Sequence, residues 1–103
     1  MTTELNEENF EESIKQGNAV LDFYADWCGP CQMMEPTLQK VSKEFKEVHF
    51  FKINVDENQQ IASTYAVRSI PTIIFLKNGK EFDRIIGLLN EMEFRERVKV
   101  AFK

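Results

Sequence analysis

The stretch Trp27-Cys28-Gly29-Pro30-Cys31 contains the only two cysteines of a chain of 103 residues. Two thiols separated by two residues can close a small ring and open it again. Gly29 permits a tight bend of the backbone, and Pro30 fixes φ near the helical value at the start of a helix. A disulfide across so short a loop removes little entropy from the unfolded chain, so it is a poor staple for the fold. The spacing therefore favours reversible dithiol–disulfide chemistry.

The sequence leaves two other uses of the cysteines open. A structural zinc site needs four nitrogen or sulfur ligands, and the chain has two cysteines and one histidine, His49. An intramolecular zinc cage is therefore one ligand short, and we predict no metal site. The cysteines could instead be inert residues of a buried core. Trp27 before them and Gly29-Pro30 between them are more typical of an exposed junction between a loop and a helix, which favours the redox role.

The composition limits the class of protein and of partner. Apolar residues make up 43% of the chain and nine residues are phenylalanine, so the chain can bury a core, and its length suits one domain over residues 1–103. The net charge of −4 argues against nucleic acid or an anionic membrane as a partner, because both need basic patches. No apolar run approaches the ~20 residues that span a bilayer, and residues 1–12 are too acidic and polar for a secretory signal. A single close cysteine pair fits a reducing cytoplasm, so we expect a cytoplasmic monomer.

The spacing of apolar residues predicts four helices. Phe10 and Ile14, four residues apart, indicate a first helix that begins near Asn6. A second helix follows over residues 30–45, where apolar residues recur at helical spacing. Two further helices are predicted, a short one that carries Ile61, Ala62 and Tyr65, and a last one that opens at Asn90 and buries Phe94, Val98 and Phe102.

Apolar runs between these helices predict the strands. Residues 19–24 and 48–55 each form one such run, and Asn78-Gly79 is a strong hairpin signal between residues 72–76 and 81–86. A short strand over residues 2–5 would add a fifth. Strands joined through helices should be parallel, whereas the hairpin adds antiparallel strands, so we expect an α/β fold with a central mixed sheet of four to five strands flanked by four helices. The cysteines then lie where a strand ends and a helix begins, which is where open α/β sheets place their sites.

The two cysteines should differ in chemistry. The attacking species in disulfide exchange is the thiolate, and an unperturbed cysteine is mostly protonated at neutral pH. Cys28 lies at the helix N-terminus, where unpaired N–H groups and the helix dipole stabilise an anion. Cys31 lies one turn further in, where we expect it to be more buried. Cys28 is therefore predicted to be the nucleophile, and Cys31 the thiol that resolves the mixed disulfide.

Resolution by Cys31 needs a base, and Asp22 is the candidate. It interrupts the apolar run of residues 20–24, six residues before Cys28. An exposed strand position would make it an ordinary solvated carboxylate, but its bulky neighbours favour burial behind the cysteines. Burial raises the pKa of a carboxyl and would let it exchange protons with Cys31 near neutral pH. Lys52, in the next strand, could partner Asp22 or be solvated, and His49 is interpreted as structural or exposed.

Several segments of the chain resemble the thioredoxin family, and together they cover nearly its whole length. The run Asp22-Phe23-Tyr24-Ala25-Asp26-Trp27-Cys28-Gly29-Pro30-Cys31 resembles the active-site block, and its Cys-Gly-Pro-Cys motif is highly specific. Pro36 falls where thioredoxins kink their second helix. Further matches are the lysine-containing strand, the loop with the family's cis-proline, the hairpin and a later glycine, which correspond here to Lys52-Ile53-Asn54-Val55-Asp56, Arg68-Ser69-Ile70-Pro71-Thr72, Phe75-Leu76-Lys77-Asn78-Gly79 and Gly87.

The resemblance implies a thioredoxin fold and a protein-disulfide reductase. It implies Cys28 as nucleophile, Cys31 as resolving thiol and Asp22 as the buried acid–base group, loosely paired with Lys52. Gly29, Pro30 and Lys52 would tune the redox couple, and the Ile70-Pro71 bond would be cis and face the cysteines. The implied apolar docking surface consists of Trp27, Gly29, Pro30, Ile70, Pro71, Gly87 and Leu88.

The resemblance also implies partners. The substrates would be protein disulfides, the electron donor an NADPH-dependent thioredoxin reductase, and the redox centre the Cys28–Cys31 disulfide itself, with no bound cofactor. The chain departs from the family at Tyr24, Gln32, Ser69 and Leu88, where a tryptophan, a basic residue, a glycine and a smaller residue are common. These departures concern substrate preference and redox tuning rather than activity.

The sequence leaves three other functions open. The fold could act as a docking module whose thiols are incidental. A thiol oxidase or isomerase is a second alternative, although the Gly-Pro between the cysteines argues against it. A glutaredoxin is a third, and the motif lacks the tyrosine typical of that family.

Overall fold

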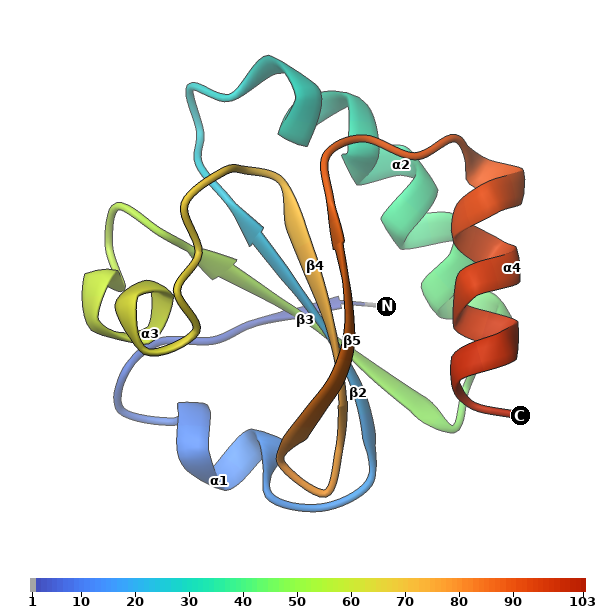
Figure 1. Ribbon diagram of the computed structural model, residues 1–103, viewed down its shortest axis with the longest axis horizontal. Helices are drawn as coiled ribbons and strands as arrows, with labels where there is room; N and C mark the ends of the chain where they lie inside the picture. Colours follow the sequence, from blue (N-terminus) through green and yellow to red (C-terminus); the bar gives the residue numbers. More distant parts are fainter. Residues whose placement is uncertain (1) are drawn as a thin grey trace.

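A five-stranded sheet with helices on both faces forms the protein, and the computed structural model describes residues 2–103 (Figure 1). In chain order the elements are β1 (Thr2–Glu4), α1 (Phe10–Ile14), β2 (Asn18–Tyr24), α2 (Gly29–Glu44), β3 (Val48–Asn54), α3 (Gln59–Thr64), β4 (Thr72–Lys77), β5 (Lys80–Ile86) and α4 (Glu91–Ala101). The expected mixed sheet and the expected order of elements are confirmed. No helix of residues 2–103 is long and apolar enough to cross a membrane.

Strand β2, which leads into the cysteines, lies at the centre of the sheet. The strand order is β1-β3-β2-β4-β5. Strand β2 pairs with β3 in parallel and with β4 antiparallel, and Asp22 is the register partner of Lys52 on β3 and of Ile73 on β4. This central position buries five consecutive residues of β2. Asp22 is therefore held in the interior by the sheet itself.

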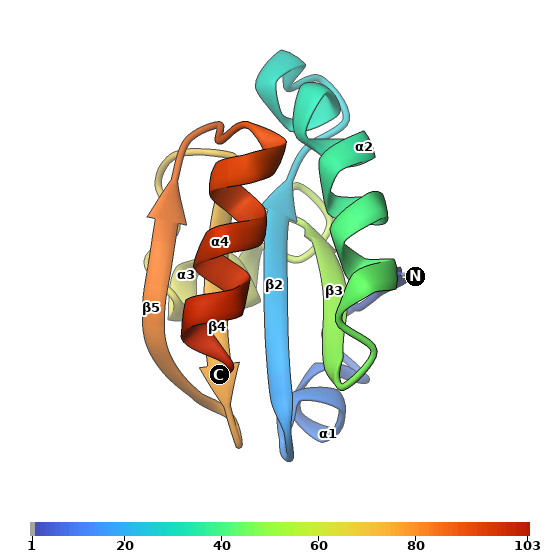
Figure 2. The same ribbon diagram turned by 90° about the vertical axis from the view of Figure 1, so that its right-hand side faces the viewer.

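The side chains of β2 point alternately to the two faces of the sheet, and the core is divided into two layers. Leu21 and Phe23 point to the side of α1 and α3, whereas Val20 points to the side of α2 and α4. Figure 2 shows α2 and α4 side by side over one face of the sheet. Asp22 shares the face of Val20, because side chains two residues apart on a strand point the same way. It therefore lies beneath the helix that carries the cysteines.

The start of the first helix and the burial of Phe102 differ from the sequence prediction. Helix α1 begins at Phe10, because the side chain of Asn6 instead caps a turn and accepts hydrogen bonds from the N–H groups of Glu8 and Asn9. Helix α4 is capped as predicted, since Asn90 Oδ1 accepts a hydrogen bond from the Glu93 N–H at 2.8 Å. Phe102 follows that helix and is half-buried rather than buried.

The hairpin between β4 and β5 is built on the predicted turn. Asn78 and Gly79 both have positive φ, 50° and 81°, the conformation that a two-residue hairpin turn requires. The same turn is attached to the end of the first helical segment, because the Gly17 N–H donates to Asn78 Oδ1 and the Asn78 N–H donates to the Gly17 carbonyl.

Candidate active site

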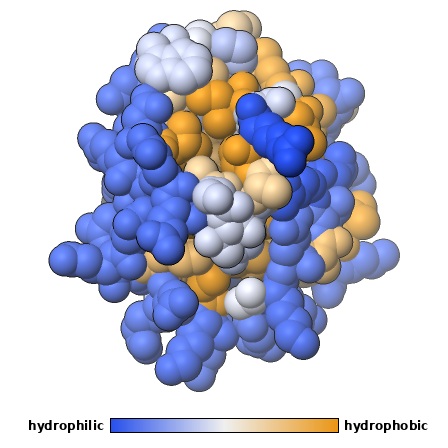
Figure 3. Space-filling view, turned by 60° about the vertical axis from the view of Figure 1, so that its left-hand side comes forward, coloured by the Kyte–Doolittle hydropathy of each residue, from blue (hydrophilic) through white to orange (hydrophobic). Residues whose placement is uncertain are grey.

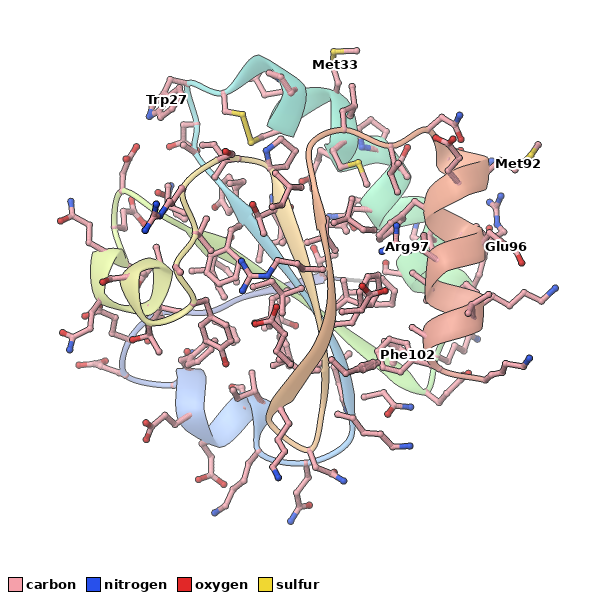
Figure 4. The ribbon with its side chains drawn as sticks, viewed as in Figure 1. Trp27, Met33, Met92, Glu96, Arg97 and Phe102 are labelled. Carbon is pink, nitrogen blue, oxygen red and sulfur yellow. A yellow bond between two sulfur atoms is a disulfide. The ribbon has the colours of Figure 1, made fainter. Side chains whose placement is uncertain are left out.

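The two cysteines form a disulfide at the junction between β2 and α2. Cys28 is the N-cap residue of α2 and Cys31 lies in its first turn, with 5.3 Å between their Cα atoms. The Cys28 Sγ accepts a hydrogen bond from the Cys31 N–H at 3.2 Å. One of the unpaired donors at the helix N-terminus is thus directed at the Cys28 sulfur, which is the arrangement that stabilises a thiolate. Figure 4 shows the disulfide near Trp27, at the end of the molecule where α2 begins.

The expected difference in burial between the cysteines is wrong for the disulfide form. Cys28 is 4% exposed and Cys31 is 6% exposed. Both pack with Ala25 in a small apolar cluster, against which Tyr24, Val55 and Ile70 are packed. The loop before β4 covers Cys28 and removes the difference that helix position alone would predict. What distinguishes the two sulfurs is therefore the helix N-terminus and not exposure.

The loop before β4 brings its proline next to the cysteines. The Ile70-Pro71 peptide bond is cis, as the resemblance implied, and the Ile70 carbonyl oxygen lies 3.9 Å from the Cys28 Sγ. The Gly87 N–H donates a hydrogen bond of 2.9 Å to the Pro71 carbonyl. Gly87 has φ of +102°, a conformation that favours glycine. This bond attaches the segment with Leu88 to the edge of the site.

Two segments next to the site, one before Cys28 and one around Gly87, carry exposed apolar side chains. Trp27 is 71% exposed, and Leu88 and Ile86 are also exposed. On the side that Figure 3 brings forward, apolar residues form an area enclosed by hydrophilic ones. Trp27 is held in place at its polar end, because its Nε1–H donates to Asp56 Oδ2 at 2.8 Å. The ring is thus fixed while its apolar face remains free.

Asp22 lies on the face of the sheet that α2 covers and is almost completely buried, with 2% of its surface exposed. Burial raises the pKa of its carboxyl to about 7 from the ordinary value of 3.8, against a smaller lowering by the charge of Lys52 and a further raising by Glu35 and Glu4. Its Oδ1 has no hydrogen-bond partner among the described residues. The group can therefore gain or lose a proton near neutral pH.

Lys52 forms its ion pair with a different carboxylate. Its Nζ lies 2.7 Å from Glu35 Oε1 on α2 and 4.4 Å from the centre of the Tyr24 ring. The expected pairing with Asp22 is thus limited to a longer-range electrostatic effect. The physical reason is that Glu35 keeps about a third of its side-chain surface in solvent, so pairing there costs less desolvation than pairing with the buried Asp22.

A small hollow opens beside Cys31. It has a volume of about 160 Å³ and is lined by seven residues, Tyr24, Ala25, Asp26, Cys31, Gln32, Glu35 and Lys52. The hollow can admit water. It therefore joins the resolving cysteine to the Lys52–Glu35 ion pair and to solvent.

Comparison with known proteins identifies the family. The model of the Thioredoxin family matches residues 1–100. A thioredoxin from Chlamydia pneumoniae is 46% identical over 84 residues, which are 82% of this chain and 82% of that relative. One from Rickettsia felis is 42% identical over 91 residues, or 85% of this chain and 87% of the relative. This chain belongs to the thioredoxin family.

Solved structures agree with this assignment. A mutant thioredoxin from Halobacterium salinarum NRC-1 matches with a TM-score of 0.90 at 31% identity, over 99% of this chain and 91% of that chain. The thioredoxin of Malassezia sympodialis matches with a TM-score of 0.89 at 30% identity, over 100% and 92%. As a thioredoxin-family member with a disulfide-forming Cys28 and Cys31, the protein is a thiol-disulfide oxidoreductase that acts as a protein-disulfide reductase.

The structure brings most of the predicted site residues together at one end of the sheet. Cys28 and Cys31 lie at the junction between β2 and α2, Asp22 lies earlier on β2 beneath α2, and Ile70 of the loop before β4 packs against the cysteines. Sequence reasoning missed two residues of this region. Glu35 carries no motif, and its only signal is its place one helical turn after Cys31. Asp56 follows a predicted strand, and nothing in the sequence links it to Trp27, 29 residues earlier.

Proposed function

We propose that Cys28 is the nucleophile and Cys31 the resolving thiol of the reductase. The Cys28 thiolate attacks one sulfur of a substrate disulfide, forms a mixed disulfide and releases the other substrate sulfur as a thiolate. The Cys31 thiolate then attacks the Cys28 Sγ, closes the Cys28–Cys31 disulfide and releases the second substrate thiolate. Two electrons pass to the substrate in this exchange. The observation that carries the assignment is the N-cap position of Cys28, whose Sγ accepts the Cys31 N–H.

Asp22 serves in this proposal as the acid–base group for Cys31. Its raised pKa of about 7 is supported by its burial between the sheet and α2. A carboxylate with such a pKa can take the proton of the Cys31 thiol as that thiol attacks, and can return it when the disulfide is opened again. The hollow beside Cys31 gives water access to the resolving thiol, and Lys52 and Glu35 are among the residues that line it.

Substrates dock, in this proposal, on Trp27, Gly29, Pro30, Ile70, Pro71, Gly87 and Leu88. Pro71 has no N–H, and the backbone at Ile70 lies next to Cys28, so an extended substrate segment could align there as an added strand. The fixed, exposed Trp27 ring would contribute apolar contact on the opposite side. Gly29 and Pro30 keep the first turn of α2 free of bulky side chains, and with Lys52 they tune the redox couple.

Family membership and the cysteine pair support a proposal for the compartment and the electron donor of the protein. We propose a single domain over residues 1–103 that works as a monomer in the cytoplasm and is reduced again by an NADPH-dependent thioredoxin reductase. Family membership supports a reductase partner, and the two-residue cysteine pair supports a reducing compartment.

Trapping of the mixed disulfide tests the assignment of the two cysteines. We expect Cys31→Ser to accumulate a covalent complex with a disulfide-containing protein such as insulin, visible on non-reducing gels and by mass. Cys28→Ser should form no such complex and should not reduce the substrate. The opposite pattern, or full turnover by either variant, would refute the assignment. A double variant that still binds a protein partner with full affinity would favour the docking-module alternative.

A further inference from the structure

Glu35 differs from Glu44, the other acidic residue of α2, because two different side chains hold its carboxylate in place. Lys52 Nζ lies 2.7 Å from Oε1, and Gln39 Nε2 donates a hydrogen bond of 2.8 Å to Oε2. Gln39 Nε2 in turn donates to Thr2 Oγ1 on β1 at 2.8 Å. Partial burial favours the protonated form of Glu35, but the bonds from Gln39 and Lys52 outweigh it and lower its pKa. Glu35 is thus a fixed negative charge.

The ammonium of Lys52 interacts with two carboxylates, by an ion pair with Glu35 and through space with Asp22. Lys52 and Asp22 are register partners on adjacent parallel strands, so their side chains leave the sheet on the same face. Glu35 faces that pair from the helix above. Lys52 is only 18% exposed and lies over the Tyr24 ring, so few other partners can reach its ammonium. It pairs with Glu35, while Asp22 Oδ1 remains without a hydrogen bond among the described residues.

We propose that Glu35 is a positioning residue, which holds the Lys52 ammonium at the hollow beside Cys31 and so keeps it from forming an ion pair with Asp22. This inference rests on the acid–base role proposed above for Asp22. An ammonium paired directly with Asp22 would stabilise the carboxylate and weaken it as a base toward Cys31. Glu35 therefore keeps Asp22 basic enough for the thiol. At the same time it keeps a positive charge at the hollow beside Cys31.

Other charged groups around Asp22 do not replace Glu35. From β1, Glu4 acts on Asp22 through space, but its Oε2 accepts the Tyr24 hydroxyl at 2.7 Å. From α2, Cys28 and Cys31 are held in a disulfide and do not titrate in this form. Lys52 on β3 is the cation that acts on Asp22, and Glu35 is the residue that fixes it.

Titration of the Asp22 carboxyl by ¹³C NMR in the oxidised protein tests this directly, with Asp22→Asn to assign the signal. In Glu35→Ala, the Asp22 midpoint should fall from about 7 by roughly one pH unit, as expected for loss of a nearby charge at an effective dielectric constant of about 20 together with release of Lys52. Glu35→Gln keeps an oxygen acceptor for Lys52 and should give a smaller fall. Glu44→Ala is the matched control, because Glu44 is on the same helix but pairs with Arg95, and it should leave the midpoint unchanged.

A double-mutant cycle separates positioning from the charge of Glu35 itself. In the Lys52→Met background, Glu35→Ala should lower the Asp22 midpoint clearly less than in the native background, because no ammonium is released. An unchanged midpoint in Glu35→Ala, or the same fall in both backgrounds, would overturn the proposal. The pH profile of mixed-disulfide resolution should move with the NMR midpoint. If the Asp22 midpoint moves in Glu35→Ala while the pH profile of resolution is unchanged, the positioning role of Glu35 stands and the acid–base role of Asp22 is refuted.

Discussion

Lys52 directs its ammonium to Glu35 on helix α2 and not to Asp22, its register partner on the neighbouring strand. Asp22 is consequently a buried carboxyl whose charge is only partly compensated, with a pKa raised to about 7. A group of this kind costs stability when it is ionised, and it provides a proton acceptor near neutral pH. The stability and the chemistry of this site are therefore linked through one side chain.

Replacement of Asp22 should change stability in a pH-dependent way. Below about pH 4, Asp22 is protonated in both the folded and the unfolded protein. Between pH 4 and 7 the unfolded state ionises while the folded state does not, because the folded pKa is the higher one, so stability is lost as pH rises. The difference between the two pKa values corresponds to roughly 4 kcal/mol, which is lost in full above pH 7.

Asp22→Asn removes this titration, so its stability relative to the native protein should rise by up to roughly 4 kcal/mol between pH 4 and pH 8. Urea unfolding of both oxidised proteins at the two pH values measures it. An equal stability difference at pH 4 and pH 8 would show that Asp22 does not titrate in this range in the folded state.

The Trp27–Asp56 hydrogen bond should fix the ring for substrate docking. Asp56→Ala removes the acceptor of the indole N–H, and we expect the ring to become more mobile and kcat/KM for a protein disulfide to fall a few-fold, or about 1 kcal/mol. Because the chain has one tryptophan, fluorescence anisotropy reports this ring alone. The control is Glu57→Ala, which makes the same change of charge at the residue next to Asp56. Equal anisotropy and equal kcat/KM in the two variants would show that Asp56 does not fix the Trp27 ring for docking.

Gly87 should be more sensitive to substitution than Gly29, although a methyl group added at either position would meet open space. Gly87 has φ of +102°, so Gly87→Ala forces an L side chain into a left-handed conformation, which costs about 1–2 kcal/mol. The bond from its N–H to the Pro71 carbonyl should also weaken. Gly29→Ala lies at a helix start without positive φ and should leave stability nearly unchanged. Thermal unfolding of the two variants makes the comparison, and an equal loss in both would contradict it.

Local patterns predicted most of the fold. The Asn78-Gly79 turn, the Asn90 cap and the helical spacing in α2 depend on residues close in sequence, and each is found as predicted. The cis Ile70-Pro71 bond was implied by the family resemblance alone, because such a bond has no strong local signal.

The contacts that were missed join segments far apart in the chain. The Lys52–Glu35 ion pair depends on how α2 is rotated about its axis over the sheet. The spacing of apolar residues in α2 does not fix this rotation closely enough to show which polar side chain faces Lys52. The near-equal burial of the cysteines depends on the Ile70 loop, 42 residues from Cys28. The hydrogen bond of Trp27 depends on the end of a neighbouring strand. In each case the tertiary arrangement decides which of several polar or apolar partners is reached.

The redox midpoint of the Cys28–Cys31 couple tests the central claim most directly. The protein is equilibrated in graded dithiol/disulfide buffers, and free thiols are counted by alkylation and mass. A reductant should have a midpoint near roughly −270 mV, the value typical of thioredoxins. A midpoint between roughly −120 and −180 mV would make the protein an oxidant or isomerase and contradict the account.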